Sequence, residues 1–113
     1  MDVLYSIIIP AFNEENWLPQ ILPRLKAAMA TCKVPGEIIV VDNNSSDNTP
    51  RIAVEHGARI IFEPHNQISR ARNTGARAAR GRYFIFLDAD TILPAGLLTA
   101  CLLYTSPSPR DRS

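Results

Sequence analysis

Four short runs of apolar residues recur along the chain, separated by polar or amphipathic stretches. The runs cover residues 3–9, 37–41, 58–62 and 83–87. They are continuously apolar and rich in isoleucine and valine, whereas a strand with one solvated face alternates between apolar and polar residues. The pattern therefore predicts an α/β fold in which four buried strands form an open parallel sheet with helices on both faces.

The connection between the first two runs predicts an amphipathic helix. Its apolar residues recur at helical spacing, and they are Leu18, Ile21, Leu22, Leu25 and Met29. Asn13 or Asn16 suits the N-cap, because an Asn side chain accepts a hydrogen bond from a free N–H of the first turn. Pro23 lacks a backbone N–H and clashes with the preceding turn, so we expect a kink or a late start there.

The other two connections also predict helices. The second helix should start near Asp47 and stop at Gly57. We assign Asp47, Ser45 and Ser46 mainly to the capping of this helix, because short polar side chains satisfy the free N–H groups of a first turn. The third helix should cover residues 67–80, whose alanines would let it pack close to the sheet.

Composition and charge narrow the functional classes. The chain has 113 residues and a formal net charge of +1, so it lacks the charge excess typical of proteins that bind nucleic acid. Its apolar runs are far shorter than the roughly 20 residues of a membrane helix. Cys32 and Cys101 lack metal-ligand spacing and indicate reduced thiols. We expect a cytoplasmic protein, with any membrane association carried by other parts of the complete protein.

Residues 101–113 differ from the rest of the sequence. They show no periodicity, contain two Ser-Pro pairs and end in a basic stretch. They also resemble the in-frame translation of a sequencing adapter. We therefore expect the fold to lie in residues 1–100 and residues 101–113 to be a non-native or disordered tail.

Polar and acidic residues follow three of the four predicted strands. Residues 10–15 follow the first strand, residues 42–47 the second and residues 88–90 the fourth. In open parallel sheets, ligands bind beyond the carboxyl ends of the strands. The three clusters are therefore predicted to converge on one edge of the sheet and to form a ligand site there.

Asp88 and Asp90 are the candidate metal ligands of this site. Residues two apart along a strand point to the same face, and two ionised carboxylates so close repel unless a cation lies between them. Mg²⁺ or Mn²⁺, held by one or two carboxylates and completed by substrate phosphates, fits this arrangement. The alternative is a solvated turn that contains two Asp residues.

Three further side chains are candidates for ligand contact. Asp42 ends a strand expected to be central, where a carboxylate needs a donor such as a nucleobase N–H; alternatively, it caps its own turn. Phe12 either stacks on a base or packs in the core. Arg72 is one of five arginines between residues 70 and 82, and it is a candidate for contact with a diphosphate.

Four segments, taken in order, resemble the family 2 glycosyltransferases. They are IIIPAFNEE at residues 7–15, VVDNNSSDNT at 40–49, ARNTGARAARG at 71–81 and FIFLDAD at 84–90. The resemblance implies a partial GT-A (Rossmann-like) fold, a nucleotide-diphosphate sugar donor such as a UDP- or GDP-sugar, and assistance by Mg²⁺ or Mn²⁺. It also implies transfer to an acceptor hydroxyl with inversion. Residues 1–100 would then be the N-terminal, nucleotide-sugar-binding part of a glycosyltransferase domain.

The resemblance assigns roles to individual residues. Its nucleotide-binding positions fall on Pro10, Ala11, Phe12, Glu14, Asp42 and Asp88. Asp90 matches the direct metal ligand, with Asp88 near the ribose and the metal. The general base that activates the acceptor comes after the Asp-x-Asp motif in this family, so we expect the chain by itself to be catalytically inactive.

Two alternatives use the same residues differently. FIFLDADTIL also resembles the first motif of haloacid-dehalogenase-like phosphatases, in which Asp88 would be the nucleophile and Asp90 the acid/base. A non-catalytic module that binds a nucleotide sugar is the second alternative.

Overall fold

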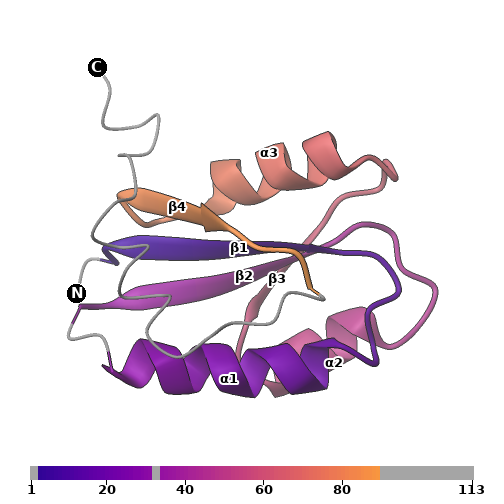
Figure 1. Ribbon diagram of the computed structural model, residues 1–113. Coiled ribbons are helices and arrows are strands. Elements are labelled where there is room, and N and C mark those ends of the chain that lie inside the picture. Colours follow the sequence, from indigo (N-terminus) through magenta and orange to yellow (C-terminus); the bar gives the residue numbers. More distant parts are fainter. Residues whose placement is uncertain (1–2, 32–33, 90–113) are drawn as a thin grey trace.

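The computed structural model describes residues 3–31 and 34–89, and its strands form one parallel sheet. The strands are β1 (Tyr5–Ala11), β2 (Gly36–Asp42), β3 (Arg59–Phe62) and β4 (Tyr83–Phe86). Their order across the sheet is β3-β2-β1-β4 (Figure 1). Because every pairing is parallel, the strands all start at one edge, the amino edge, and all end at the opposite one, the carboxyl edge.

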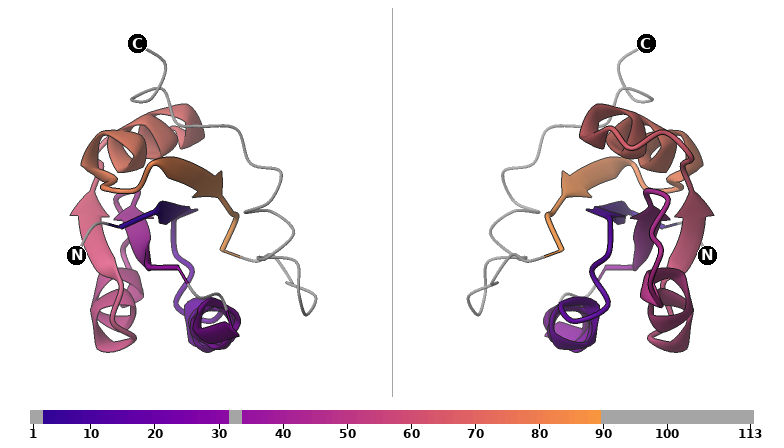
Figure 2. Two further views of the ribbon diagram at one scale, coloured as in Figure 1. Left: turned by 90° about the vertical axis from the view of Figure 1, so that its left-hand side faces the viewer. Right: turned by 90° about the vertical axis from the view of Figure 1, so that its right-hand side faces the viewer.

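Three helices cover the two faces of the sheet. They are α1 (Leu18–Thr31), α2 (Thr49–Glu55) and α3 (Ile68–Ala78). Helices α1 and α2 lie on one face and α3 lies on the other (Figure 2). The predicted α/β fold is thus confirmed. None of the helices in residues 3–31 and 34–89 has the length and apolar character needed to cross a bilayer.

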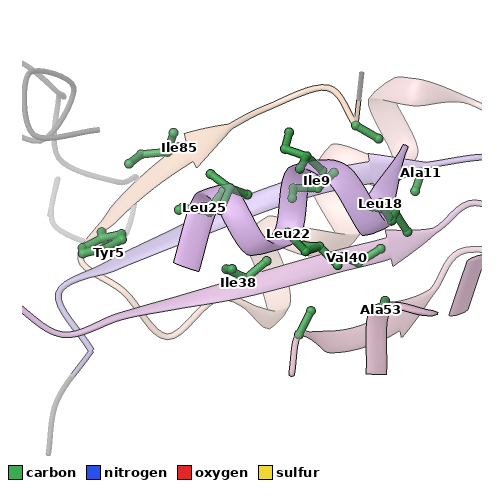
Figure 3. Packing of buried hydrophobic residues seen from close by; sticks show 14 residues of the cluster. Tyr5, Ile9, Ala11, Leu18, Leu22, Leu25, Ile38, Val40, Ala53 and Ile85 are labelled. Atoms are coloured by element: carbon green, nitrogen blue, oxygen red, sulfur yellow. The ribbon is translucent and has the colours of Figure 1, made fainter. Parts of the chain in front are cut away.

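The core consists of two layers, because successive residues of a strand point to opposite faces of the sheet. Ile7, Ile9, Ile38 and Val40 pack with the buried side chains of α1 and α2 (Figure 3). Ile8, Ile39 and Val41 pack under α3. Each such side chain contributes about 1.5–3 kcal/mol by leaving water. The continuous apolar runs therefore reflect burial on both faces.

Helix α3 approaches the sheet closely at Gly75. A Cβ atom at this position would lie 2.5 Å from Cγ2 of Ile8 and 2.9 Å from Cγ2 of Val41. Ala71, one turn earlier on the same helix, is fully buried. The predicted close packing of the third helix is confirmed, and Gly75 leaves no room for a side chain.

Strand β1 differs from the prediction at both ends, because it begins and ends two residues later and includes Pro10. The Ile8 carbonyl accepts from the Leu87 N–H of the β4 segment, whereas the Ala11 carbonyl accepts from the Asn43 N–H beside β2. Backbone groups alternate sides along a strand, so the missing N–H of Pro10 is on the β4 side. Pairing with β4 has ended at Ile8, and a proline is tolerated there as on an edge strand.

The start of α1 differs from one of the predicted alternatives, whereas the start of α2 agrees with the prediction. Helix α1 begins at Leu18, five residues before Pro23, so the expected late start is wrong. Because Pro23 has no N–H, one carbonyl, that of Pro19, lacks its usual helical hydrogen bond. Pro19 is exposed, so water can hydrogen-bond to this carbonyl instead. Helix α2 begins at Thr49 with Asn48 as its N-cap, which agrees with the predicted start near Asp47, and Gly57, with a φ of 82°, follows its C-cap His56.

Candidate functional site

A pocket of about 270 Å³ opens at the carboxyl edge. Its lining residues come from the end of β1, from the segments after β1, β2 and β4, and from the start of α3: Pro10, Ala11, Phe12, Glu14, Asn43, Ile68, Asp88 and Ala89. The strand order reverses between β1 and β4, which is where open α/β sheets bind their ligands. The structure thus brings five of the predicted nucleotide-binding residues to one cavity.

The pocket combines apolar and acidic side chains. Phe12 and Ile68 both line the pocket and are each 52% exposed, so neither side chain is part of the core. The alternative in which Phe12 packs in the core is therefore wrong. Glu14 and Asp88 also belong to the lining, so an exposed aromatic ring and two acidic residues lie around the same pocket.

Asp88 lies at the rim of the pocket and faces a basic side chain of α3. Oδ1 of Asp88 is 3.8 Å from Nη2 of Arg72, and the two side chains are 62% and 47% exposed. A pair so long and so well solvated contributes little to stability, typically below about 1 kcal/mol. The contact nevertheless shows that Arg72 reaches the same rim as Asp88.

The predicted metal site is only partly within the described residues. Asp90 lies outside them. Among residues 3–31 and 34–89, no three His, Cys, Asp or Glu side chains are grouped closely enough to hold a metal ion on their own. The carboxylates of Glu14 and Asp88 in the pocket lining are nevertheless the hard oxygen donors that Mg²⁺ and Mn²⁺ prefer. A cation here would need further ligands, such as Asp90 or phosphate oxygens.

Asp42 is buried beside the pocket and does not line it. Its Oδ1 accepts a hydrogen bond from the Ser45 N–H at 3.0 Å. The geometry therefore shows the turn-capping role that the sequence left as an alternative. Contact between Asp42 and a base stays a prediction.

Asn43 lines the pocket directly, and the sequence patterns did not single it out. Its Nδ2 donates to the carbonyl of Glu63 at 3.1 Å and also to the carbonyl of His65. Both amide hydrogens are thereby used by the segment that follows β3, which fixes the orientation of the side-chain amide. The other polar atom of the side chain, Oδ1, is a hydrogen-bond acceptor by its chemistry.

Glu63 is a second residue that the sequence did not single out. It is buried after β3, and its carboxylate accepts hydrogen bonds from the Thr74 hydroxyl and from the His65 N–H. These hydrogen bonds, in that order of importance, hold the pKa of Glu63 below its usual range. Because Thr74 belongs to α3, the ionised carboxylate ties the end of β3 to the helix that carries Arg72.

These features place the chain in the class of open parallel α/β domains, in which ligands generally bind beyond the carboxyl ends of the strands. The family model for glycosyl transferase family 2 matches residues 6–109, and the chain belongs to this family. An uncharacterized glycosyltransferase of Mycobacterium tuberculosis is 34% identical over 91 residues, which are 80% of this chain and 38% of that protein. The chain therefore spans well under half the length of this relative.

Solved structures of glycosyltransferases share the fold. Mannosyl-3-phosphoglycerate synthase from Rubrobacter xylanophilus superimposes with a TM-score of 0.78 at 22% identity, covering 90% of this chain and 36% of that one. Glucosyl-3-phosphoglycerate synthase from Mycobacterium tuberculosis, in complex with Mn²⁺ and UDP, gives a TM-score of 0.72 at 24% identity, covering 89% and 38%. The GT-A fold implied by the sequence resemblance is confirmed.

Proposed function

We propose that the pocket at the carboxyl edge binds a nucleotide-diphosphate sugar, a UDP- or GDP-sugar, and that the complete protein transfers the sugar to an acceptor hydroxyl with inversion. One observation supports this most strongly. A single cavity is lined by Pro10, Ala11, Phe12, Glu14 and Asp88, which match the donor-binding positions of the family. Membership of the glycosyltransferase family favours transfer over the phosphatase interpretation of residues 84–93.

The base is proposed to lie against Phe12, beside Pro10 and Ala11. The exposed ring of Phe12 offers a flat apolar surface, and base–aromatic stacking is worth about 1–3 kcal/mol. Asn43 contributes the Oδ1 acceptor for an N–H of the base, and Asp42 holds the turn from which Asn43 projects. A second role of Asp42 in base recognition belongs to the same proposal.

The diphosphate is proposed to lie near Asp88 and Arg72. Asp88 and Asp90 would hold Mg²⁺ or Mn²⁺, which when bound supplies positive charge to the departing diphosphate. Arg72 adds a guanidinium at the same rim, and such a group pairs well with phosphate oxygens. The Mn²⁺ and UDP present in the structure of glucosyl-3-phosphoglycerate synthase support this part of the proposal.

Donor binding and transfer are proposed to be separable in this protein. We assign no general base to the described residues, so the chain by itself is proposed to bind the donor without transferring sugar. The domain responsible is placed in residues 1–100, with residues 101–113 as a tail outside it. We place the protein in the cytoplasm, because Cys32 and Cys101 lack the spacing of a disulfide framework or a zinc site.

Calorimetry of the chain with UDP and GDP, in Mn²⁺ and in EDTA, tests the proposal. One of the two nucleotides should bind in Mn²⁺, and removal of the Mn²⁺ by EDTA should weaken its binding at least about tenfold.

Asp88→Asn should lower the affinity for this nucleotide in Mn²⁺, with Glu55→Gln on the exposed end of α2 as the control. Phe12→Ala should also lower it, with Phe62→Ala as the matched control because Phe62 is equally exposed on β3. Absence of binding by both nucleotides contradicts the function, and equal affinity in EDTA contradicts the metal.

A further inference from the structure

Two loops at the carboxyl edge face each other beside the pocket. Residues 12–17 connect β1 to α1 and carry the pocket residues Phe12 and Glu14. Residues 43–48 connect β2 to α2 and carry Asn43. The two loops are joined by hydrogen bonds between the backbone of each loop and the side chains of the other.

The first set of hydrogen bonds runs from the first loop to the second loop and to Thr49, the first residue of α2. Three consecutive backbone N–H groups donate to side-chain oxygens: Asn13 to Ser45 at 2.9 Å, Glu14 to Thr49 at 2.9 Å and Glu15 to Asp47 at 3.3 Å. The backbone amides of this segment are therefore occupied by the neighbouring loop.

The second set runs in the opposite direction. The Ser46 N–H donates to Oδ1 of Asn13 at 2.8 Å, and the Asn48 N–H donates to Oε2 of Glu15 at 3.1 Å. Asn13 also has a φ of 53°, in the left-handed region that Asn tolerates better than most residues. Asn13 therefore satisfies a backbone group of the second loop and allows the turn after Phe12. The expectations that Asn13 caps α1 and that Ser45 and Ser46 cap α2 are wrong, because these side chains join the loops.

Asp47 connects the first loop to the start of α2. One oxygen accepts from the Thr49 N–H and hydroxyl, and the other accepts from the Glu15 N–H. Burial opposes ionisation, but the hydrogen bonds from Thr49 and Glu15 outweigh it and hold the pKa of Asp47 below its usual range. The predicted contact with the start of α2 is present, although Asp47 precedes the N-cap position.

We infer that Asn13 and Asp47 are positioning residues of the donor site, a role that rests on the proposed function. Neither residue lines the pocket. Both hold the first loop against the second, so they keep Phe12 and Glu14 at the pocket beside Asn43. Loss of this connection between the loops, the loop clamp, should lower nucleotide affinity while the sheet and its core stay folded.

Substitutions of Asn13 separate its two contributions, which are the Oδ1 acceptor and the tolerance of a positive φ. Asn13→Asp keeps an acceptor and the tolerance of positive φ. At high salt, which screens its added charge, it should bind the preferred nucleotide, UDP or GDP, with Mn²⁺ within about twofold of the unsubstituted chain. Asn13→Gly keeps the backbone conformation and loses the acceptor, so affinity should fall about tenfold. Asn13→Ala loses both and should bind more weakly still. Asn16→Ala, exposed in the same loop, is the matched control and should leave affinity unchanged.

Hydrogen exchange of backbone amides decides whether the clamp exists, independently of any ligand. In Asn13→Gly, exchange should accelerate together at residues 13–15 and at Ser46 and Asn48, while the amides of β1 and β2 keep their protection. Unchanged exchange at Asn48 overturns the clamp, because the two loops then open separately. Faster exchange with unchanged affinity for the preferred nucleotide overturns the positioning role alone. If the unsubstituted chain binds neither UDP nor GDP, the proposed function fails, and with it the positioning role, while exchange still decides the clamp.

Discussion

The two edges of the sheet use their carboxylates in different ways. At the amino edge, Glu37 accepts hydrogen bonds from the Ser6 hydroxyl at 2.6 Å, from Arg59 at 2.6 Å and from the Arg80 N–H at 2.7 Å. The Ser6 hydroxyl accepts in turn from the Gly81 N–H at 2.8 Å. At the carboxyl edge, Asp88 has a side chain 62% exposed and a contact of 3.8 Å to Arg72. One carboxylate joins strands, whereas the other faces solvent at a pocket.

Pocket size alone does not identify the functional edge. The amino edge has a cavity of about 300 Å³, slightly larger than the 270 Å³ at the carboxyl edge. Burial opposes ionisation of Glu37, but hydrogen bonds from Ser6, Arg80 and Arg59 outweigh it and hold its pKa below the usual range. The carboxylate of Glu37 is thus hydrogen-bonded to other groups of the protein. The two edges therefore differ less in the volume of their cavities than in whether their carboxylates are already hydrogen-bonded within the protein.

The largest effect on stability is expected from Gly81→Ala at the amino edge. A Cβ atom there would lie 2.5 Å from the carbonyl carbon of Tyr5 and 2.7 Å from the Ser6 nitrogen. Because both atoms are backbone, β1 has to shift, and the free energy of unfolding should fall by about 3 kcal/mol. Urea denaturation measures the free energy of unfolding. Ala30→Gly on the exposed side of α1 is the control, and it should lower this free energy by about 1 kcal/mol. If Gly81→Ala lost less unfolding free energy than this control, β1 would be able to shift at the amino edge at little cost in stability.

The next effect is expected from Glu37→Gln. Loss of the charge weakens the hydrogen bonds from Ser6, Arg59 and Arg80, so the free energy of unfolding should fall by about 2 kcal/mol. Nucleotide affinity should stay unchanged, because Glu37 is at the opposite edge from the pocket. Glu55→Gln, which breaks an exposed pair with Arg51, is the matched control and should cost below about 0.5 kcal/mol. Weaker nucleotide binding in Glu37→Gln would contradict the separation of the two edges.

Acid should remove the stability advantage that the Glu37 carboxylate has over the neutral amide of the Glu37→Gln variant. The pKa of Glu37 is lower in the folded than in the unfolded chain, so its contribution is complete above the unfolded value of about 4.3 and is lost as pH falls through the folded value. The difference in unfolding free energy between the two proteins should therefore shrink below about pH 4.3. Urea titrations at several pH values measure this difference. A difference that grows in acid would reverse the sign argued for this carboxylate.

The smallest effect on stability is expected from Asp88→Asn at the carboxyl edge. Its long, solvated contact with Arg72 contributes little, so the free energy of unfolding should change by less than about 0.5 kcal/mol. The same substitution is expected to lower nucleotide affinity in Mn²⁺. A loss of stability comparable with that of Glu37→Gln would show that Asp88 is structural and would remove the contrast between the edges.

The strands, their parallel arrangement and the edge that carries the pocket could be predicted from the sequence. Burial on both faces leaves continuous apolar runs, and parallel strands bring the residues that follow them to one edge. The ends of β1 could not be predicted in this way. Whether Pro10 belongs to the strand depends on where pairing with β4 stops, and an apolar run contains no information about pairing.

The residues that the sequence misassigned or missed act through distant partners. Asn13 and Ser46 are 33 residues apart, so a local pattern indicates only that each favours a cap or a turn. Asn43 likewise has the signature of a turn residue, and its place in the pocket depends on carbonyls of the segment after β3. Glu63 depends on the Thr74 hydroxyl of the next helix.

The strand order also has a consequence for the time at which the pocket forms. The loop clamp needs only residues up to Thr49, all in the first half of the sequence. The opposite wall, Asp88 and Ala89, follows β4, which is the last strand in the described part of the chain and pairs with β1, the first. A growing polypeptide therefore contains every residue of the loop clamp well before it contains the opposite wall of the pocket. A ligand in the cavity can therefore be bound by both walls only after β4 has paired with β1.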